Sequence, residues 1–144
     1  MPLRTNALLP VLALAAAFAV PGAPARADLI TACAPEIGKY CSAVSRGRGR
    51  ISACLASYMG QLGAACQPEV QAVMQSRLTP GYVRNALNPA FKAALPQACT
   101  ASAARFCPGM PASGGRVLAC LYAYSDHIPK TCSDAAQAAL RQGQ

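Results

Sequence analysis

The chain has 144 residues, of which 53% are hydrophobic, 6% are aromatic and none is tryptophan. Thirteen Lys and Arg against five Asp and Glu give a formal net charge of +8, and there is one histidine. With so few carboxylates and one imidazole, general acid–base catalysis has few candidate groups, and we expect a non-enzyme.

Residues 1–27 have the features of a secretory signal peptide. Arg4 precedes an apolar stretch over 8–20, and small residues follow as far as Ala27, after which cleavage is predicted. The apolar run is shorter than the about 20 residues that a membrane span needs, and no other stretch is apolar enough to span a bilayer. The mature chain of 144 − 27 = 117 residues keeps 11 basic and 5 acidic residues, a net charge of +6, and all eight cysteines. An even number of cysteines in a short exported chain indicates disulfides, in the periplasm or outside the cell.

The first part of the mature chain, residues 28–78, reads as three helices. Apolar residues recur there at three- and four-residue steps, which is typical of one helix face. The first predicted helix carries an apolar face from Ile30 to Cys41, the second runs from Arg50 until Gly63 ends or kinks it, and the third covers 68–78. Thr31 is the expected cap of the first, and Pro35 is tolerated there because it falls in the first turn. A glycine-punctuated turn separates the first helix from the second.

Residues 79–96 form a predicted connector between two similar halves. A short helix over 82–87 and a second from Asn88 to near Pro96 are expected, because Asn-Pro is a typical helix start. The apolar residues of the connector favour packing over a free linker. Residues 97–144 then repeat the first pattern, with a last helix over 134–141 that Ser133 would cap.

The cysteines reveal an internal duplication. They form two sets with the spacing C-x7-C-x12-C-x11-C, and the second set lies 66 residues after the first at all four positions. The sets are Cys33, Cys41, Cys54 and Cys66, and Cys99, Cys107, Cys120 and Cys132. Neighbouring residues match in the same register, such as Tyr58 with Tyr124 and Gly49-Arg50-Ile51 with Gly115-Arg116-Val117. Two copies of one repeat therefore make up most of the mature chain.

The repeat resembles the cysteine-rich repeat of the Golgi apparatus cysteine-rich protein, which is also described as a cysteine-rich fibroblast growth factor receptor. The likeness rests on Lys-Tyr-Cys or Arg-Phe-Cys, then a Gly-Arg-Ile/Val turn, then Ala-Cys-Leu and a final cysteine. It covers residues 29–72 and 95–140. It implies a two-repeat exported protein of a kind found in bacteria, with a protein- or glycan-binding precedent. No ligand-binding residue carries over.

Helix geometry limits the disulfide pairing. Cys33 and Cys41 lie eight residues apart on one predicted helix, about 12 Å by helical rise, whereas bridged Cα atoms lie within about 7 Å. The same objection applies to Cys54 with Cys66 unless the chain folds back. A crossed pairing (Cys33–Cys54, Cys41–Cys66) and a nested pairing remain open. An antiparallel hairpin favours the nested one, whose bridges are Cys33–Cys66, Cys41–Cys54, Cys99–Cys132 and Cys107–Cys120.

Catalytic and metal-binding interpretations have weaker support. Zinc sites use closely spaced cysteine pairs or histidine partners, which these spacings do not provide, so no metal or cofactor is expected. Ser125-Asp126-His127 gathers the residue types of a catalytic triad. Adjacent helical residues point in different directions, however, and a triad needs the histidine between the other two groups.

We therefore predict an all-α fold of two tandem disulfide-stapled helical hairpins with a short helical connector. The expected function is an exported, non-catalytic binding or structural module for a protein, a glycan or the envelope surface, and not for nucleic acid. One alternative is a saposin-like binder of the envelope or lipid surface, with Arg46, Arg48 and Arg50 as candidate contacts to anionic groups. A second alternative is a periplasmic metal-handling protein that uses cysteine thiolates.

Overall fold

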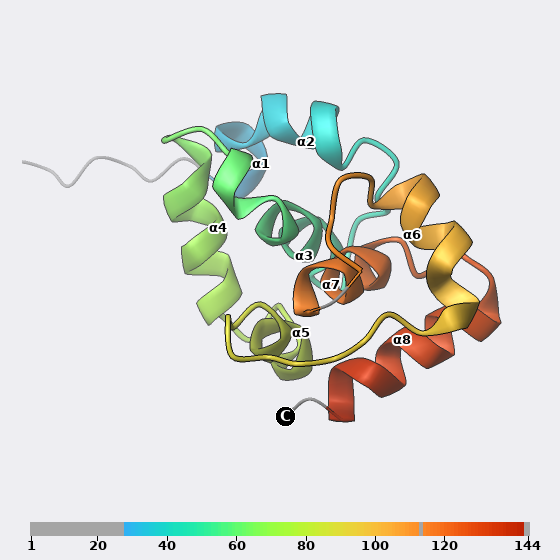
Figure 1. Ribbon diagram of the computed structural model, residues 1–144. Coiled ribbons are helices and arrows are strands. Elements are labelled where there is room, and N and C mark those ends of the chain that lie inside the picture. Colours follow the sequence, from blue (N-terminus) through green and yellow to red (C-terminus); the bar gives the residue numbers. More distant parts are fainter. Residues whose placement is uncertain (1–27, 113, 143–144) are drawn as a thin grey trace, which may run out of the picture.

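The computed structural model describes residues 28–112 and 114–142, so the predicted signal peptide at 1–27 lies outside the described part (Figure 1). Every secondary-structure element of the described residues is a helix, which confirms the predicted all-α class. The α-helices are α1 (Leu29–Ala32), α2 (Ala34–Tyr40), α3 (Arg50–Ser57), α4 (Cys66–Gln75), α5 (Gly81–Ala86), α6 (Thr100–Phe106), α7 (Gly115–Ala123) and α8 (Lys130–Gln142). Two short 3-10 helices are η1 (Met59–Gln61) and η2 (Gln97–Cys99).

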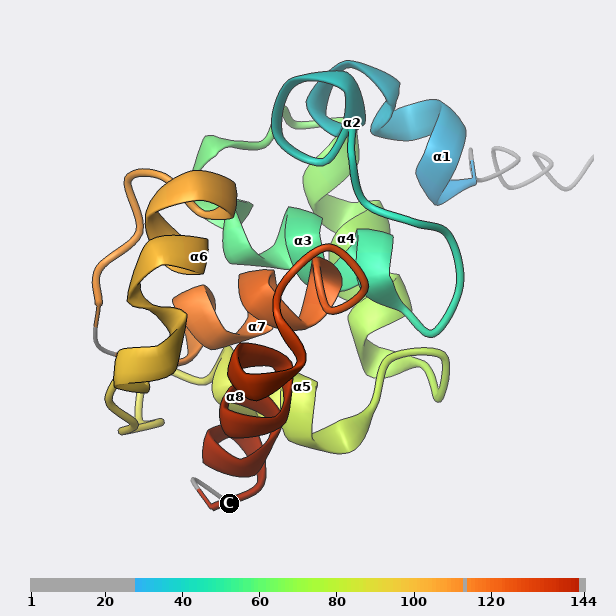
Figure 2. The same ribbon diagram turned by 90° about the vertical axis from the view of Figure 1, so that its right-hand side faces the viewer.

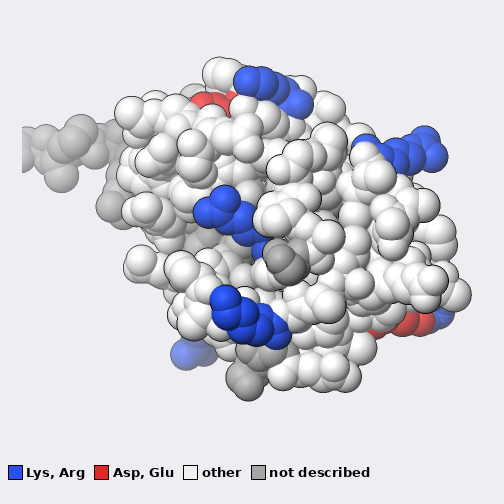
Figure 3. Space-filling model, in the orientation of Figure 1, with Lys and Arg blue, Asp and Glu red and all other residues white. Residues whose placement is uncertain are grey.

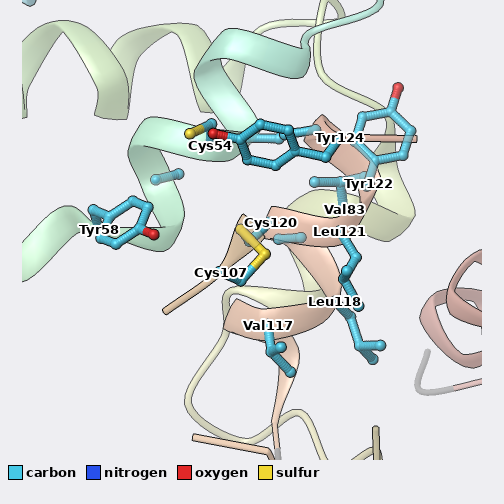
Figure 4. Close-up of a cluster of buried hydrophobic side chains, with 14 of the residues drawn as sticks. Cys54, Tyr58, Val83, Cys107, Val117, Leu118, Cys120, Leu121, Tyr122 and Tyr124 are labelled. Carbon is cyan, nitrogen blue, oxygen red and sulfur yellow. A yellow bond between two sulfur atoms is a disulfide. The ribbon is translucent and has the colours of Figure 1, made fainter. Parts of the chain in front are cut away.

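The second helix of each repeat forms the centre of the molecule. α3 and α7 pack against each other, with α4 beside α3, α8 beside α7, and α5 against α7 and α8 (Figures 1 and 2). Leu55 of α3 and Leu118 and Leu121 of α7 are fully buried. In Figure 4, Leu118 and Leu121 project from one side of α7, while Cys120 bonds Cys107 on another. Burial of these apolar faces joins the two repeats into one core.

The disulfides have the nested arrangement in both repeats. The outer bridges, Cys33–Cys66 and Cys99–Cys132, join the start of each repeat to its last helix, with Cα–Cα distances of 4.7 Å. The inner bridges, Cys41–Cys54 and Cys107–Cys120, close each hairpin with Cα–Cα distances of 6.1 Å. All eight cysteines are paired. In each repeat one disulfide therefore closes the hairpin, and another joins the start of the repeat to its last helix.

The first helix of repeat 1 is divided, which the periodicity did not predict. Cys33 is the C-cap of α1 and the N-cap of α2, and it lies two residues before Pro35. A proline inside a continuous helix would lack its amide hydrogen bond and would clash with the carbonyl four residues earlier. The cap of the first segment is also Asp28 rather than Thr31. The Asp28 carboxylate accepts hydrogen bonds from the amides of Ile30 and Thr31 at 2.9 and 3.2 Å.

Three other predicted helix bounds were wrong. α3 ends at Ser57 and tightens into η1 instead of continuing to residue 63. The Ser57 hydroxyl donates to the Ala53 carbonyl at 2.8 Å, a contact that bends helices. α4 begins at Cys66 and ends at Gln75, so it lies slightly earlier than predicted. α8 begins at Lys130, which places Ser133 inside the helix and not at its cap.

The connector contains one helix and not two. α5 matches the first predicted helix, but residues 88–96 form no helix. The Asn88 side chain accepts from the Ala90 amide at 2.9 Å, which makes a turn. The chain then pairs with the loop of repeat 2, where the Leu95 amide donates to the Ala112 carbonyl at 3.1 Å. These backbone bonds replace those that a helix would have made.

The connector makes close backbone contacts with both repeats at matched glycines. A Cβ on Gly49 would lie 3.0 Å from the Thr79 Cα, and one on Gly115 would lie 1.5 Å from the Ala86 carbonyl oxygen. Thr79, which is 1% exposed, also shares a 3.0 Å hydrogen bond with Ser52 of α3. The connector is therefore packed, and its path depends on glycine at the start of α3 and of α7.

Candidate binding surfaces

A groove between the two hairpins is lined by matched residues of both repeats. It has a volume of about 410 Å³. Three of the matched pairs that line it are Tyr58 with Tyr124, Tyr40 with Phe106, and Lys39 with Arg105. Both residues of each pair line the same groove, so corresponding surfaces of the two hairpins face each other here. We call this surface the inter-repeat groove.

Two aromatic pairs, one stacked and one tilted, form the inner wall of the inter-repeat groove. The Tyr40 and Tyr58 ring centroids lie 4.6 Å apart, and those of Phe106 and Tyr124 lie 5.1 Å apart. Tyr58 and Tyr124 are only 6% and 5% exposed, and burial raises the pKa of both phenols. The Tyr124 hydroxyl donates to the Tyr40 backbone carbonyl at 3.1 Å, a bond that crosses between the repeats. The buried rings of Tyr58 and Tyr124 therefore stay uncharged at neutral pH.

A cation lies over an outer ring in each half of the inter-repeat groove. The Lys39 Nζ lies 4.8 Å from the Tyr40 ring centroid, and the Arg105 Cζ lies 5.1 Å from that of Phe106. Such contacts contribute about 0.5–1 kcal/mol at exposed sites. Both side chains are exposed, so their charges remain accessible to a partner.

The basic turn of repeat 1 does not present three equivalent arginines. Arg46 and Arg48 are exposed, whereas the Arg50 side chain is 15% exposed and pairs with Asp126 of repeat 2 at 3.1 Å. Arg50 also donates to the backbone carbonyls of Ser45 and Arg46 at 3.2 and 2.9 Å. Sequence reasoning grouped the three by proximity along the chain. The structure gives Arg50 the separate task of holding the turn against repeat 2.

Ser125-Asp126-His127 joins this contact between the repeats. The His127 Nε2 lies 3.3 Å from the Ser45 hydroxyl of repeat 1 and 3.7 Å from the Asp126 carboxylate. A catalytic relay uses the two ring nitrogens for its two partners, whereas here one nitrogen faces both. Hydrogen bonding from the Ser45 hydroxyl and, more weakly, the charge of Arg50 hold the pKa of Asp126 below its usual value. The cluster is a polar contact between the repeats.

A second groove lies between α4, α5 and the start of α7. It has a volume of about 710 Å³ and includes Met59, Met74, Arg84 and Arg116 among its lining residues. Sequence reasoning did not find this groove, because its walls come from both repeats and from the connector. We call it the Arg116 groove.

Comparison with known families bears on the repeat itself. Residues 25–63 match the family model described as a cysteine rich repeat. The first half contains a cysteine-rich repeat. The match confirms the family predicted from the sequence and includes Cys33, Cys41 and Cys54. Searches of curated proteins and of solved structures give no significant match.

Within 28–112 and 114–142, no helix combines the length and apolar character needed to cross a membrane. In the same ranges, no three His, Cys, Asp or Glu side chains gather in a way that would hold a metal ion.

Proposed function

We propose that the protein is an exported, non-catalytic binding module that uses the inter-repeat groove as its binding surface. The observation that supports this most directly is the symmetric lining of the groove. Each hairpin contributes one pair of contacting aromatic rings and one exposed cation, and the two outer rings are 66 positions apart in the sequence. A partner would therefore contact both repeats, and its affinity would depend on their being held together.

The chemistry of the groove favours an acidic peptide segment of a partner protein. Lys39 and Arg105 provide two positive charges, no Asp or Glu lines the groove, and the aromatic wall offers apolar contact. Charge complementarity of this kind steers encounter and selects partners. Rigid aromatic anchors with Arg nearby are typical of residues that dominate binding energy.

Four disulfides make the groove suited to an oxidising compartment. They account for all eight cysteines, so a metal-handling role through thiolates would require their reduction first. Protein isolated without reductant should contain no free thiol by mass spectrometry after alkylation. Several alkylated cysteines would instead favour the metal-handling alternative.

Matched charge-removal variants test the groove. The probe is a fluorescent octapeptide of alternating Glu and Leu, measured by anisotropy at low and at high salt. The double variant Lys39→Gln/Arg105→Gln should weaken binding about tenfold, since charged contacts each contribute about 1 kcal/mol or more. The double variant Arg46→Gln/Arg48→Gln removes the same charge outside the groove and should bind nearly as well as the unaltered protein.

Several results would contradict the groove assignment. These are the absence of peptide binding to the unaltered protein, equal loss in both double variants, and binding only to a heparin oligosaccharide tested in parallel. The last result would indicate a glycan partner.

The exposed Arg46 and Arg48 support a second candidate, binding to the envelope surface. Phosphatidylglycerol vesicles are the probe for it. If this alternative holds, the Arg46→Gln/Arg48→Gln variant loses salt-sensitive vesicle binding, because exposed charges act through screened attraction. The Lys39→Gln/Arg105→Gln variant then keeps it.

A further inference from the structure

The two repeats differ at two positions that face their common interface. Tyr122 of repeat 2 corresponds to Ala56 of repeat 1, and Asp126 corresponds to Gly60. Each pair is separated by the same 66 residues as the cysteines. A bulky aromatic side chain and a carboxylate in one repeat are thus replaced in the other by a methyl group and a hydrogen atom.

Tyr122 and Asp126 of repeat 2 make contacts with repeat 1 and with the connector. The Tyr122 hydroxyl donates to the Arg48 carbonyl at 2.6 Å, and the residue is 7% exposed. Its ring meets Tyr82 of α5 edge-on, with centroids 6.0 Å apart. Asp126 completes this side by pairing with Arg50 at 3.1 Å.

On the other side, the corresponding space is the Arg116 groove. Ala56 lines it where the counterpart of the Tyr122 ring would be, and Met59 lines it next to Gly60, the counterpart of Asp126. Arg116 is the counterpart of Arg50 and is exposed. Across residues 28–112 and 114–142, its guanidinium has no ion pair and no hydrogen bond to a protein group.

The surroundings of Arg116 are basic and apolar. Arg84 lines the same groove and donates to the Gln75 carbonyl at 3.3 Å. Met74 and Leu87 add apolar surface, and no Asp or Glu is among the lining residues. Figure 3 shows this face, where Lys and Arg side chains stand beside a hollow near the centre and the visible acidic side chains lie toward the edges.

We propose that the Arg116 groove binds a small carboxylate with an unbranched apolar chain. Its carboxylate pairs with Arg116 as Asp126 pairs with Arg50, and its chain lies against Met59, Met74 and Leu87. The volume of about 710 Å³ lies within the range of about 300–1,000 Å³ typical of small-molecule sites. Methionine side chains adapt to flexible apolar ligands. Arg84 supplies a second positive charge at the same groove.

This site is separate from the inter-repeat groove. The two grooves share no lining residue, and the second proposal does not depend on the first. A negative result at one groove therefore leaves the proposal for the other groove intact.

Octanoate is the probe, and the methionine methyl groups report binding. In the protein labelled with [13C-methyl]methionine, octanoate should shift the NMR signals of Met59 and Met74 and leave that of Met110 unchanged. Met110 is outside the lining of the groove and serves as the internal control. Acetate, which lacks the chain, and octanol, which lacks the charge, should each bind at least about tenfold more weakly. Equal shifts with octanol, or no shifts with octanoate, would overturn the proposal.

A substitution at Gly60 tests the role assigned to the counterpart of Asp126. A Cβ there would have no atom within 4 Å, so Gly60→Asp fits sterically and should supply Arg116 with an internal carboxylate. Octanoate binding should then be lost, while the isosteric, uncharged Gly60→Asn should retain it. Retention of full affinity in Gly60→Asp would contradict the proposed pairing.

Arg116→Gln provides an independent variant that adds no group at position 60. It should weaken octanoate binding about tenfold, because it removes a charged hydrogen-bond donor. Arg77→Gln removes an exposed charge outside the groove and should leave affinity within about twofold, since single surface substitutions have small effects. Equal affinity of Arg116→Gln and Arg77→Gln would refute the site even if Gly60→Asp failed to fold.

Discussion

Gly115→Ala should destabilise the protein strongly because the chain leaves no space for one methyl group. Gly115 begins α7, at the point where α5 ends. A Cβ on Gly115 would lie 1.5 Å from the carbonyl oxygen and 2.2 Å from the carbonyl carbon of Ala86. Both obstructing atoms are backbone, so no side-chain rotation relieves the clash. The substitution has to displace α5 from α7.

The size of the destabilisation follows from the apolar side chains that α5 buries against α7. The Ala86 carbonyl must retreat by about 2 Å to restore ordinary van der Waals contact. Val83 and Ala86 are 0% and 2% exposed against α7, and burial of a valine side chain contributes about 1.5–3 kcal/mol. Overpacking adds about 1–3 kcal/mol through shifted neighbours. The free energy of unfolding should therefore fall by about 3–5 kcal/mol.

Urea denaturation with the disulfides intact measures this loss. In a parallel thermal denaturation the melting temperature should fall by at least about 12 °C, given about 4 °C for each kcal/mol in a domain of this size. Gly60→Ala is the matched control, because the same methyl group meets no atom within 4 Å there. It should change stability by no more than about 1 kcal/mol, chiefly through the entropy of the unfolded chain.

A Gly115→Ala variant within 1 kcal/mol of the unaltered protein would refute this reasoning. It would mean that α5 can move without loss of its contacts. A large loss in both variants would also refute it, since the close approach to Ala86 exists at one of the two positions alone.

Three further perturbations probe other parts of the fold. Replacing both Cys41 and Cys54 with Ser should cost about 3 kcal/mol in urea denaturation, from the unfolded-state entropy released by a bridge with a separation of 13 residues; an unchanged midpoint would show that this bridge is dispensable. Tyr122→Phe should cost about 1 kcal/mol, because it removes the 2.6 Å bond to the Arg48 carbonyl; equal or greater stability would mean that water replaces the bond without loss. Asp126→Asn should lower stability at pH 7, where the carboxylate is ionised. Because the pKa of Asp126 is lowered in the folded state, its contribution should disappear as pH falls below 3.8; a stability difference that persists at pH 2 would contradict the charge-based explanation.

The disulfide framework and the helices that carry it could be predicted because they depend on short-range spacing. Cys41 and Cys54 flank a glycine-rich turn; Cys41 directly follows α2 and Cys54 lies on α3, and both helices have apolar residues at helical intervals. A hairpin closed at its turn by one bridge leaves the outer cysteines to pair with each other. The helix bounds were less predictable, since the first helix of repeat 1 is divided before Pro35 and the second ends early, at Ser57.

The connector and the Arg116 groove could not be predicted because they depend on contacts between distant segments. Residues 88–96 have a helix-start signal, but the Leu95 amide pairs with Ala112 in the loop of repeat 2. Aligning the repeats sets Ala56 against Tyr122 and Gly60 against Asp126. The alignment does not show that these positions lie together, because that depends on how α3 and α7 pack.

A single connector also explains why the two repeats must differ where it packs. Two matched hairpins can meet symmetrically, as at the inter-repeat groove, but one α5 cannot present the same side chains to both. It places Tyr82 against Tyr122 of repeat 2, whereas Arg84 and Leu87 line the groove on the side of Ala56. A tyrosine at position 56 would therefore meet a different surface from the one that Tyr122 meets. Ala56 leaves that side open, and the asymmetry forced by the connector becomes a groove with an available arginine.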